Sequence, residues 1–307
     1  MKILIATEKP FAPVAVQQIR EIVEGAGHEL ALLENYTEKS ELLAGVADAD
    51  AMIIRSDKVD KEVLEAAKNL KIVVRAGAGY DNVDLEAATA NNVVVMNTPG
   101  QNSNAVAELA IGMMIYMSRW GFDGKAGTEL KGKKLGLHAF GYISKIIATV
   151  AKGFGMEVYA FSPSVSRDPS IAAEFGAIGV KNAEELYEKC DIISLGMPAN
   201  KHTIESINYE LLSKLPEHGM VINTARKEVV NEADLVRIME EKPGFKYATD
   251  IKPNNHDEMV ERFGKRYFAS AKKCGAQTGE ANVNAGLAAA NQIVGYFKSG
   301  DETFKVN

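Results

Sequence analysis

One glycine turn between two apolar runs suggests the first chemistry in this sequence. The run K-L-G-L-H, from Lys134, is followed by A-F-G-Y-I-S, an amphipathic stretch and the run M-E-V-Y-A-F-S. At such a strand–turn–helix junction a dinucleotide fingerprint, G-x-G-x-x-G, binds a pyrophosphate through backbone N–H groups and the helix N-terminus. Here Gly141 keeps the central position, and the small residues Ala139 and Ser144 take the outer ones. An ordinary α/β packing turn would look similar, so this turn alone leaves both interpretations open.

A second glycine-rich segment could bind a carboxylate. R-A-G-A-G-Y-D-N-V-D begins at Arg75, directly after a short apolar run. Its small residues expose the backbone N–H groups of Ala76 and Gly77, which form a nest suited to an anion. The segment could also be a tight turn into a helix capped by Asp81 or Asn82.

Basic and amide side chains follow other apolar runs. Arg55 and Lys58 come after A-M-I-I, where they could meet a phosphate or lie in solvent as an ordinary basic pair. Asn102 and Ser103 are typical caps of a helix N-terminus, and Asn102 could also contact a substrate. Arg226 ends V-I-N-T-A-R and is placed to reach into a cleft between domains.

Short apolar runs alternate with helical periodicity almost throughout, which is typical of parallel sheets with helices on both faces. Beside the two runs given above, the expected strands are K-I-L-I-A, A-M-I-I-R, K-I-V-V-R, N-V-V-V-M-N, D-I-I-S-L, G-M-V-I-N and K-Y-A-T-D. A long helical segment is expected at about residues 102–120, a second series of strands from Leu135, and a small-residue helix after Gly279 that returns to the first domain. We therefore expect an α/β protein with two doubly wound parallel-sheet (Rossmann-like) domains joined by long helices. The substrate domain would comprise residues 1–98 plus 280–307, and the dinucleotide-binding domain residues 99–279.

Composition argues against several classes of protein. The chain of 307 residues is long enough for two domains, and its formal charge of −6 argues against nucleic-acid binding. Two cysteines, Cys190 and Cys274, are too few for a disulfide framework. The N-terminal run is too short for a signal peptide, and no apolar stretch reaches the roughly 20 residues that a bilayer requires. We expect a cytoplasmic protein with no bound metal.

The combined motifs resemble a known family. R-A-G-A-G-Y-D-N-V-D, N-T-P-G-Q-N, N-T-A-R and G-A-Q-T, in this order and spacing, are similar to the D-specific 2-hydroxyacid dehydrogenases over essentially the whole chain. The resemblance implies NAD-dependent oxidation of 3-phospho-D-glycerate to 3-phosphohydroxypyruvate in serine biosynthesis, by a homodimer. It implies a substrate carboxylate at Ala76 and Gly77, a substrate near Asn102, and a phosphate at Arg55 and Lys58.

The same resemblance implies the residues that perform the chemistry. Arg226 would bind the carboxylate and the 2-oxygen of the substrate. Lys273 occupies the position of the family's usual histidine, two residues before G-A-Q-T, and Asn255 replaces that histidine's glutamate partner. Losing the carboxylate favours the neutral amine that a lysine base requires. Lys273 could instead be a surface lysine beside Lys272. Implied cofactor contacts are Gly141, Tyr142, Ile143, Ala225 and Asp250.

The cofactor half departs most from the family pattern. Ser162 stands where a carboxylate would bind the ribose hydroxyls and repel a 2′-phosphate, so NADP is not excluded, and Arg167 could favour it. Gly196 replaces a common histidine, and Lys227 replaces a glycine. Two alternatives therefore stand beside the NAD-dependent enzyme: an NADP-preferring 2-keto acid reductase, and a catalytically weak binding or regulatory protein.

Overall fold

The computed structural model describes all 307 residues, which form two compact units. Unit 1 comprises Met1–Asn102 and Gln277–Asn307, and unit 2 comprises Ser103–Ala276. The chain therefore leaves and re-enters unit 1, as a discontinuous domain requires. The observed boundaries lie a few residues from the predicted ones, because residues 99–102 and 277–279 belong to unit 1.

Unit 1 contains a five-stranded parallel sheet with the order β2-β1-β3-β4-β5. Its strands are β1 (Lys2–Thr7), β2 (Glu29–Glu34), β3 (Ala51–Ile54), β4 (Ile72–Arg75) and β5 (Val94–Asn97). The strand order reverses between β1 and β3, and ligands of open α/β sheets bind at the carboxyl ends of strands near such a point. Sequence analysis identified four of these strands and missed β2.

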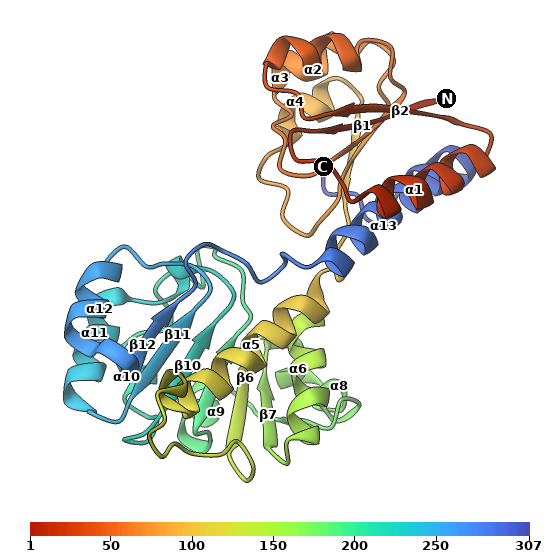
Figure 1. Ribbon diagram of the computed structural model, residues 1–307. Helices are drawn as coiled ribbons and strands as arrows, with labels where there is room; N and C mark the ends of the chain where they lie inside the picture. Colours follow the sequence, from red (N-terminus) through yellow and green to blue (C-terminus); the bar gives the residue numbers. More distant parts are fainter. The chain divides into compact units, whose positions relative to one another are not determined.

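Helices cover both faces of this sheet (Figure 1). On one face, α1 (Pro13–Gly25) and α13 (Gly279–Ser299) pack against each other and against alternate strand residues such as Ile3 and Ile5. The opposite face, with Leu4 and Ala6, carries α2 (Lys39–Val46), α3 (Lys61–Ala66) and α4 (Leu85–Ala90). The predicted return of the last helix to the first domain is confirmed. The expected cap of α4 was wrong: Asp84, not Asp81 or Asn82, accepts the hydrogen bond from Ala87 N.

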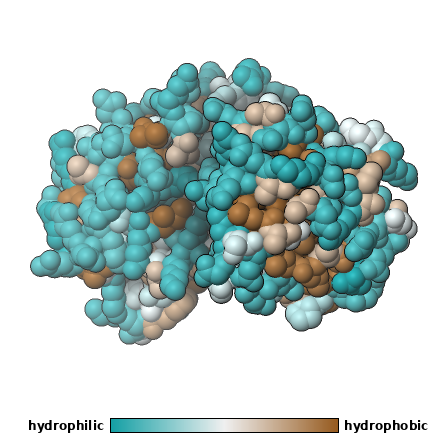
Figure 2. Space-filling view, turned by 90° about the horizontal axis from the view of Figure 1, so that it is seen from above, coloured by the Kyte–Doolittle hydropathy of each residue, from teal (hydrophilic) through white to brown (hydrophobic).

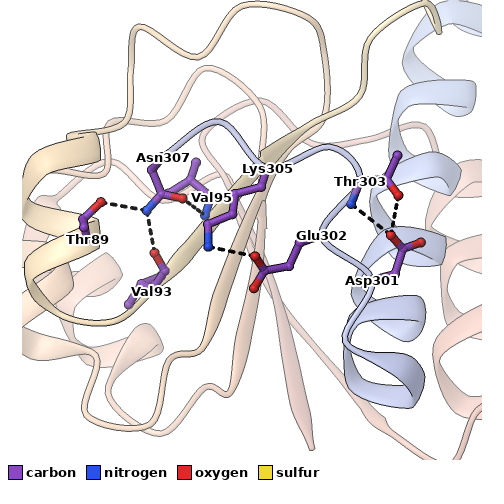
Figure 3. Close-up of polar contacts among 8 residues, drawn as sticks. All are labelled: Thr89, Val93, Val95, Asp301, Glu302, Thr303, Lys305 and Asn307. Carbon is purple, nitrogen blue, oxygen red and sulfur yellow. Dashed lines mark hydrogen bonds and ion pairs between the residues drawn. The ribbon is translucent and has the colours of Figure 1, made fainter.

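The last residues of the sequence cover the open edge of β5 (Figure 3). Lys305 forms an antiparallel bridge with Met96, and Val306 N donates to Val95 O. The side chain of Asn307 continues this pairing, because its Oδ1 accepts from Val95 N at 2.8 Å and its Nδ2 donates to Val93 O at 2.9 Å. An edge strand whose backbone groups are paired in this way offers no template for another strand.

Unit 2 contains a seven-stranded parallel sheet with the order β12-β11-β10-β9-β6-β7-β8. Its strands are β6 (Lys134–His138), β7 (Glu157–Phe161), β8 (Ile178–Gly179), β9 (Ile192–Leu195), β10 (Met220–Asn223), β11 (Lys246–Thr249) and β12 (Tyr267–Ala269). The order reverses between β6 and β9, as in dinucleotide-binding sheets. The short strands β8 and β12 escaped sequence analysis, since each is too brief to show a pattern.

Two groups of helices enclose the unit 2 sheet. The first group is α5 (Ser103–Ser118), α6 (Tyr142–Gly153), α7 (Pro163–Arg167) and α8 (Ser170–Ala173). The second is α9 (Ala183–Lys189), α10 (Tyr209–Leu212), α11 (Glu232–Glu241) and α12 (His256–Phe263). Single 3₁₀ turns lie at η1 (Trp120–Phe122), η2 (Lys227–Val229) and η3 (Gly264–Arg266). The helix expected at residues 102–120 ends at Ser118, because Trp120, Gly121 and Phe122 all have positive φ angles.

Hydrophilic residues cover most of the face shown in Figure 2, and apolar residues gather there in a few patches. The apolar side chains of the strands lie inside each unit; for example, Ile5, Ile53, Leu137 and Ile222 are all fully buried. No helix in the structure has the length and apolar character needed to cross a bilayer.

Candidate active site

The carboxyl edge of the unit 1 sheet is built around Arg75. The register pairs Arg75 with Ile54 on one side and with Asn97 on the other. Its Nε donates to Arg55 O at 2.9 Å, so the side chain lies across the edge of the sheet. A Cβ atom on Gly77 would lie 1.5 Å from Arg75 Nη1, and the φ of Gly77 is +147°. The backbone angle therefore favours glycine at position 77, and a side chain there would displace the Arg75 guanidinium.

Arg55 supplies a second guanidinium at the same edge, and the structure anchors it firmly. Its Nη1 donates to the carbonyls of Lys9 and Pro10, and its Nη2 donates to Asn282 Oδ1 at 2.7 Å. Neither Arg55 nor Arg75 forms an ion pair within the protein. Burial lowers the pKa of Arg75, and the positive charge of Arg55 lowers it further. Two partly buried cations without carboxylate partners make this edge suited to an anion.

Arg75 is the functional candidate that sequence analysis missed. In the sequence it marks only the start of the glycine segment. Lys58, expected at the phosphate, has an exposed side chain three residues beyond Arg55. The signal was available, because an arginine as the last residue of a buried strand must leave the sheet at its carboxyl edge.

The glycine segment after β4 is a loop held by amide side chains. Asn97 Nδ2 donates to Ala78 O at 2.6 Å, and Asn82 Nδ2 donates to Asp57 O at 2.7 Å. Of the two N–H groups predicted to bind a carboxylate, that of Ala76 already donates to Ile54 O and extends the sheet. Gly77 N makes no such bond, so it is the nearer candidate donor to an anion. Asn102 lies half-buried directly before α5.

The fingerprint turn of unit 2 keeps the backbone of an intact motif. Ala139 has a φ of +80°, the left-handed conformation that a first glycine would adopt without strain. Gly141 forms the N-cap of α6, with an ordinary φ of −91°, and a Cβ atom there would meet nothing within 4 Å. Neither backbone strain nor packing explains a glycine at 141. Close approach of a ligand to the backbone at the start of α6 would explain it, and Tyr142 and Ile143 follow in the first turn of that helix.

Ser162, predicted at the ribose, caps the short helix α7. Its Oγ accepts a hydrogen bond from Val165 N at 3.2 Å and lies 2.9 Å from Ser164 Oγ. The residue is buried, and its hydroxyl is oriented by these two contacts. The end of β7 therefore carries no carboxylate, and the side chain that stands there serves the local helix.

The segment N-T-A-R after β10 is fixed by the buried Asn223. Its Oδ1 accepts from Ala225 N at 3.0 Å, and its Nδ2 donates to Arg226 O at 2.9 Å. The N–H of Ala225 is thus already used, which removes it as a donor to the cofactor. Arg226 is half-buried and its Nη1 donates to Ala225 O, so the guanidinium keeps further donors for a ligand.

The turn that carries Lys273 is bound to Asp250, the residue after β11. Asp250 Oδ1 accepts from Cys274 N at 2.9 Å, and Oδ2 accepts from Gly275 N at 2.8 Å. Lys273 has an exposed side chain at the start of this turn. Asn255, which replaces the family's glutamate, lies at the N-cap of α12 and has a buried Oδ1 that receives no hydrogen bond.

A histidine outside the predictions lies beside the fingerprint turn. His138, the last residue of β6, packs on Phe161 and Tyr187, and its Nδ1 lies 3.2 Å from Tyr187 Oη. Burial lowers the pKa of His138 to about 4, so the imidazole is neutral near pH 7. Because His138 directly precedes Ala139, these contacts fix the start of the turn.

Comparison with known proteins agrees with the fold. The sequence profile of the D-isomer specific 2-hydroxyacid dehydrogenases, catalytic domain, matches residues 3–307. The chain therefore belongs to this family of dehydrogenases. A D-3-phosphoglycerate dehydrogenase of Rattus norvegicus is 33% identical over 305 residues, which cover 94% of this chain and 56% of the rat protein.

Two further relatives match this chain over nearly their full lengths. A hydroxypyruvate reductase of Thermotoga maritima is 31% identical over 284 residues, covering 86% of this chain and 90% of that protein. The crystal structure of NAD⁺-bound 3-phosphoglycerate dehydrogenase from Entamoeba histolytica is 48% identical, with a TM-score of 0.85, and covers 100% of this chain and 98% of that one. By contrast, the chain spans about half the length of the mammalian relatives that it matches.

Proposed function

We propose that this protein oxidises 3-phospho-D-glycerate to 3-phosphohydroxypyruvate with NAD⁺, the reaction expected at the entry to serine biosynthesis. The observation that carries the choice of substrate is the pair of guanidinium groups at the unit 1 edge. Arg75 ends β4 and Arg55 directly follows the adjacent strand β3; both are partly buried and have no carboxylate partner. A phosphate dianion would supply the missing charge, and planar guanidinium groups bind it through paired hydrogen bonds. The names of the rat and Entamoeba relatives support this choice.

Each site residue has a role in this proposal. The cofactor supplies the acceptor for the hydride that leaves C2 of the substrate. Lys273 takes the proton of the C2 hydroxyl as general base, and Arg226 stabilises the developing carbonyl oxygen. Gly141 and the first turn of α6 fit the pyrophosphate, because the space beside the Gly141 backbone is open.

We propose NAD rather than NADP as the cofactor. The Entamoeba relative, 48% identical, carries NAD⁺ in its structure. At the end of β7, the Ser162 hydroxyl contacts Val165 N and Ser164 Oγ, and no basic side chain bonds to it. Titration of NADH and NADPH by fluorescence quenching of Trp120 tests this assignment, since tighter binding of NADPH would contradict it.

A second candidate is the reduction of hydroxypyruvate, which the full-length match to the Thermotoga relative favours. The two substrates differ in the phosphate, so the ratio of kcat/KM for 3-phosphoglycerate and glycerate separates them. Arg75→Met should lower kcat/KM for the phosphorylated substrate by about 10- to 100-fold, the value of a charge-assisted hydrogen bond. Arg20→Met, which removes an exposed arginine of α1 from the same unit, is the matched control. Equal kcat/KM values for the two wild-type substrates would favour the second candidate.

The proposal includes a homodimer and a cytoplasmic location, both of which rest on the likeness to the family. Sedimentation velocity at micromolar concentration measures the first, and a monomer over the whole concentration range would contradict it. Fractionation of the source cells measures the second.

A further inference from the structure

The carboxylate of Asp250 has a use that the family resemblance does not assign. The residue is 2% exposed and directly follows β11, and its own N–H donates to Asn223 O at 3.0 Å. The backbone of Asp250 is therefore fixed by the neighbouring strand β10. A buried carboxylate needs hydrogen bonds to both of its oxygens. The groups that donate these hydrogen bonds are in turn held in place by the carboxylate.

Both oxygens are occupied by one short turn. Oδ1 accepts from the backbone N of Cys274 at 2.9 Å and lies 3.3 Å from its Sγ, and Oδ2 accepts from the backbone N of Gly275 at 2.8 Å. The two N–H groups are consecutive in sequence and directly follow Lys273. Their bonds to a rigid carboxylate fix the direction in which the chain leaves position 273.

Gly275 shows that the fit is tight. A Cβ atom at this position would lie 2.9 Å from Asp250 Oδ2, closer than side-chain contacts normally come. The backbone of Gly275 has no positive φ that would explain the glycine. Its lack of a side chain is thus explained by the approach of the carboxylate to the turn.

We propose that Asp250 is a positioning residue that acts through the turn 274–275 to orient Lys273, instead of serving mainly as a contact to the nicotinamide carboxamide. The inference rests on the proposed function for the role of Lys273. The anchoring of the turn itself is a separate claim that needs no activity. A misplacement of about 1 Å in a reacting group can lower the rate about 100-fold, so a flexible turn at Lys273 would slow catalysis.

Thiol labelling tests the anchoring in the full-length protein without substrate. Cys274 is exposed, whereas Cys190 is buried and burial raises the pKa of its thiol to about 12, so a disulfide reagent reports Cys274. In Asp250→Asn the turn loses one of its two acceptor oxygens and the thiol loses a neighbouring negative charge, so labelling should accelerate about tenfold or more. An unchanged labelling rate in a variant with the far-UV circular dichroism of the wild type would overturn the proposal.

Kinetics separate the positioning role from a cofactor contact. Gly275→Ala keeps the Asp250 carboxylate but pushes the turn away from it, so both Gly275→Ala and Asp250→Asn should lower kcat by about 100-fold. The KM for NAD⁺ should change little in either variant. Cys274→Ala keeps the backbone N–H and removes only the thiol, and is expected to stay within about twofold of the wild type.

Two results would contradict this inference. The first is a raised KM for NAD⁺ with an unchanged kcat in Asp250→Asn, which would point to a direct contact between Asp250 and the cofactor. The second is full activity of Gly275→Ala, which would show that the approach of the turn to the carboxylate does not orient Lys273. A wild-type protein without dehydrogenase activity would instead contradict the proposed function, since the labelling result does not depend on turnover.

Discussion

The hydroxyl of Ser144 occupies the space that a side chain at position 196 would need. A Cβ atom on Gly196 would lie 2.9 Å from Ser144 Oγ and 3.8 Å from Ala139 Cβ. Gly196 follows β9, and its N donates to His138 O at the end of β6, so these residues meet where the strand order reverses. The serine at the third fingerprint position therefore packs where it does because the residue after β9 is a glycine.

This relationship predicts a steric coupling between positions 144 and 196. Gly196→His should weaken NADH binding about tenfold, because the new side chain displaces Ser144 and with it the first turn of α6. Ser144→Gly should have little effect alone, and the double variant should recover binding, with a coupling free energy of about 1–2 kcal/mol. Fluorescence titration of NADH with the four proteins measures the cycle. Additive effects of the two substitutions would show that the residues do not share this space.

Ala139→Gly should stabilise unit 2. The left-handed conformation costs a non-glycine residue about 1–2 kcal/mol, and the entropy of glycine returns part of this, so the expected gain is about 1 kcal/mol. Trp120 is the only tryptophan and lies in unit 2, so its fluorescence follows urea unfolding of that unit. As a control, Ala148→Gly in the interior of α6 should shift the midpoint downward. A lower midpoint for Ala139→Gly would contradict the observed φ.

The neutral imidazole of His138 predicts a loss of stability in mild acid. Its pKa is about 4 in the folded protein and 6.5 ordinarily. Between these two pH values His138 binds a proton in the unfolded chain but not in the folded one. Its contribution to the free energy of unfolding is therefore complete above pH 6.5 and is lost as the pH falls toward 4. The loss should be on the order of 3 kcal/mol.

His138→Gln tests the assignment, because glutamine retains a polar partner for Tyr187 Oη but does not titrate. The difference in unfolding free energy between the variant and the wild type should narrow or reverse from pH 7 to pH 4.5. Parallel stability curves in this range would exclude His138 as the source.

Ser162→Asp should increase the preference for NAD over NADP. Aspartate is also a good N-cap, so α7 should survive, while the added carboxylate bonds the ribose hydroxyls and repels a 2′-phosphate. The selectivity change is expected to be about tenfold or more, given about 1.5–3 kcal/mol for a charge-assisted contact. The kcat/KM ratio for the two cofactors measures it, with Ser170→Asp at the exposed start of α8 as the control. An unchanged ratio would show that residue 162 does not face the ribose.

Lys273→Ala should lower kcat by about 100-fold or more, the usual effect of a positioned acid or base, while NADH still binds. Lys273→His alone should restore little activity, since Asn255 provides no carboxylate to orient an imidazole. Asn255→Glu combined with Lys273→His should restore more. Lys272→Ala is the matched control on the neighbouring exposed lysine. Near-normal turnover in Lys273→Ala would support the interpretation as a surface lysine.

Much of the fold was predictable because local sequence patterns specify most of its strands and helices. Apolar runs of four to six residues at β1, β3, β4, β5, β6, β7, β9, β10 and β11 lie between periodic helices, and all of them are strands. The predicted fingerprint turn also begins α6 as expected. The strand β2, whose apolar run L-A-L-L lies between Glu29 and Glu34, was missed; β8 and β12 were missed because they contain only two and three residues.

The sequence by itself determined which residues are of the type and spacing that the chemistry needs: Gly141, Arg226 and Lys273 are recognisable from their neighbours in the chain. Only the tertiary structure decided which partners they have. Asp250 holds the turn after Lys273 from 24 residues away, and Gly196 faces Ser144 across the point where the strand order reverses. Such pairs depend on the order of strands in a parallel sheet, where neighbouring strands are joined through long crossovers, so no local pattern in the sequence records them.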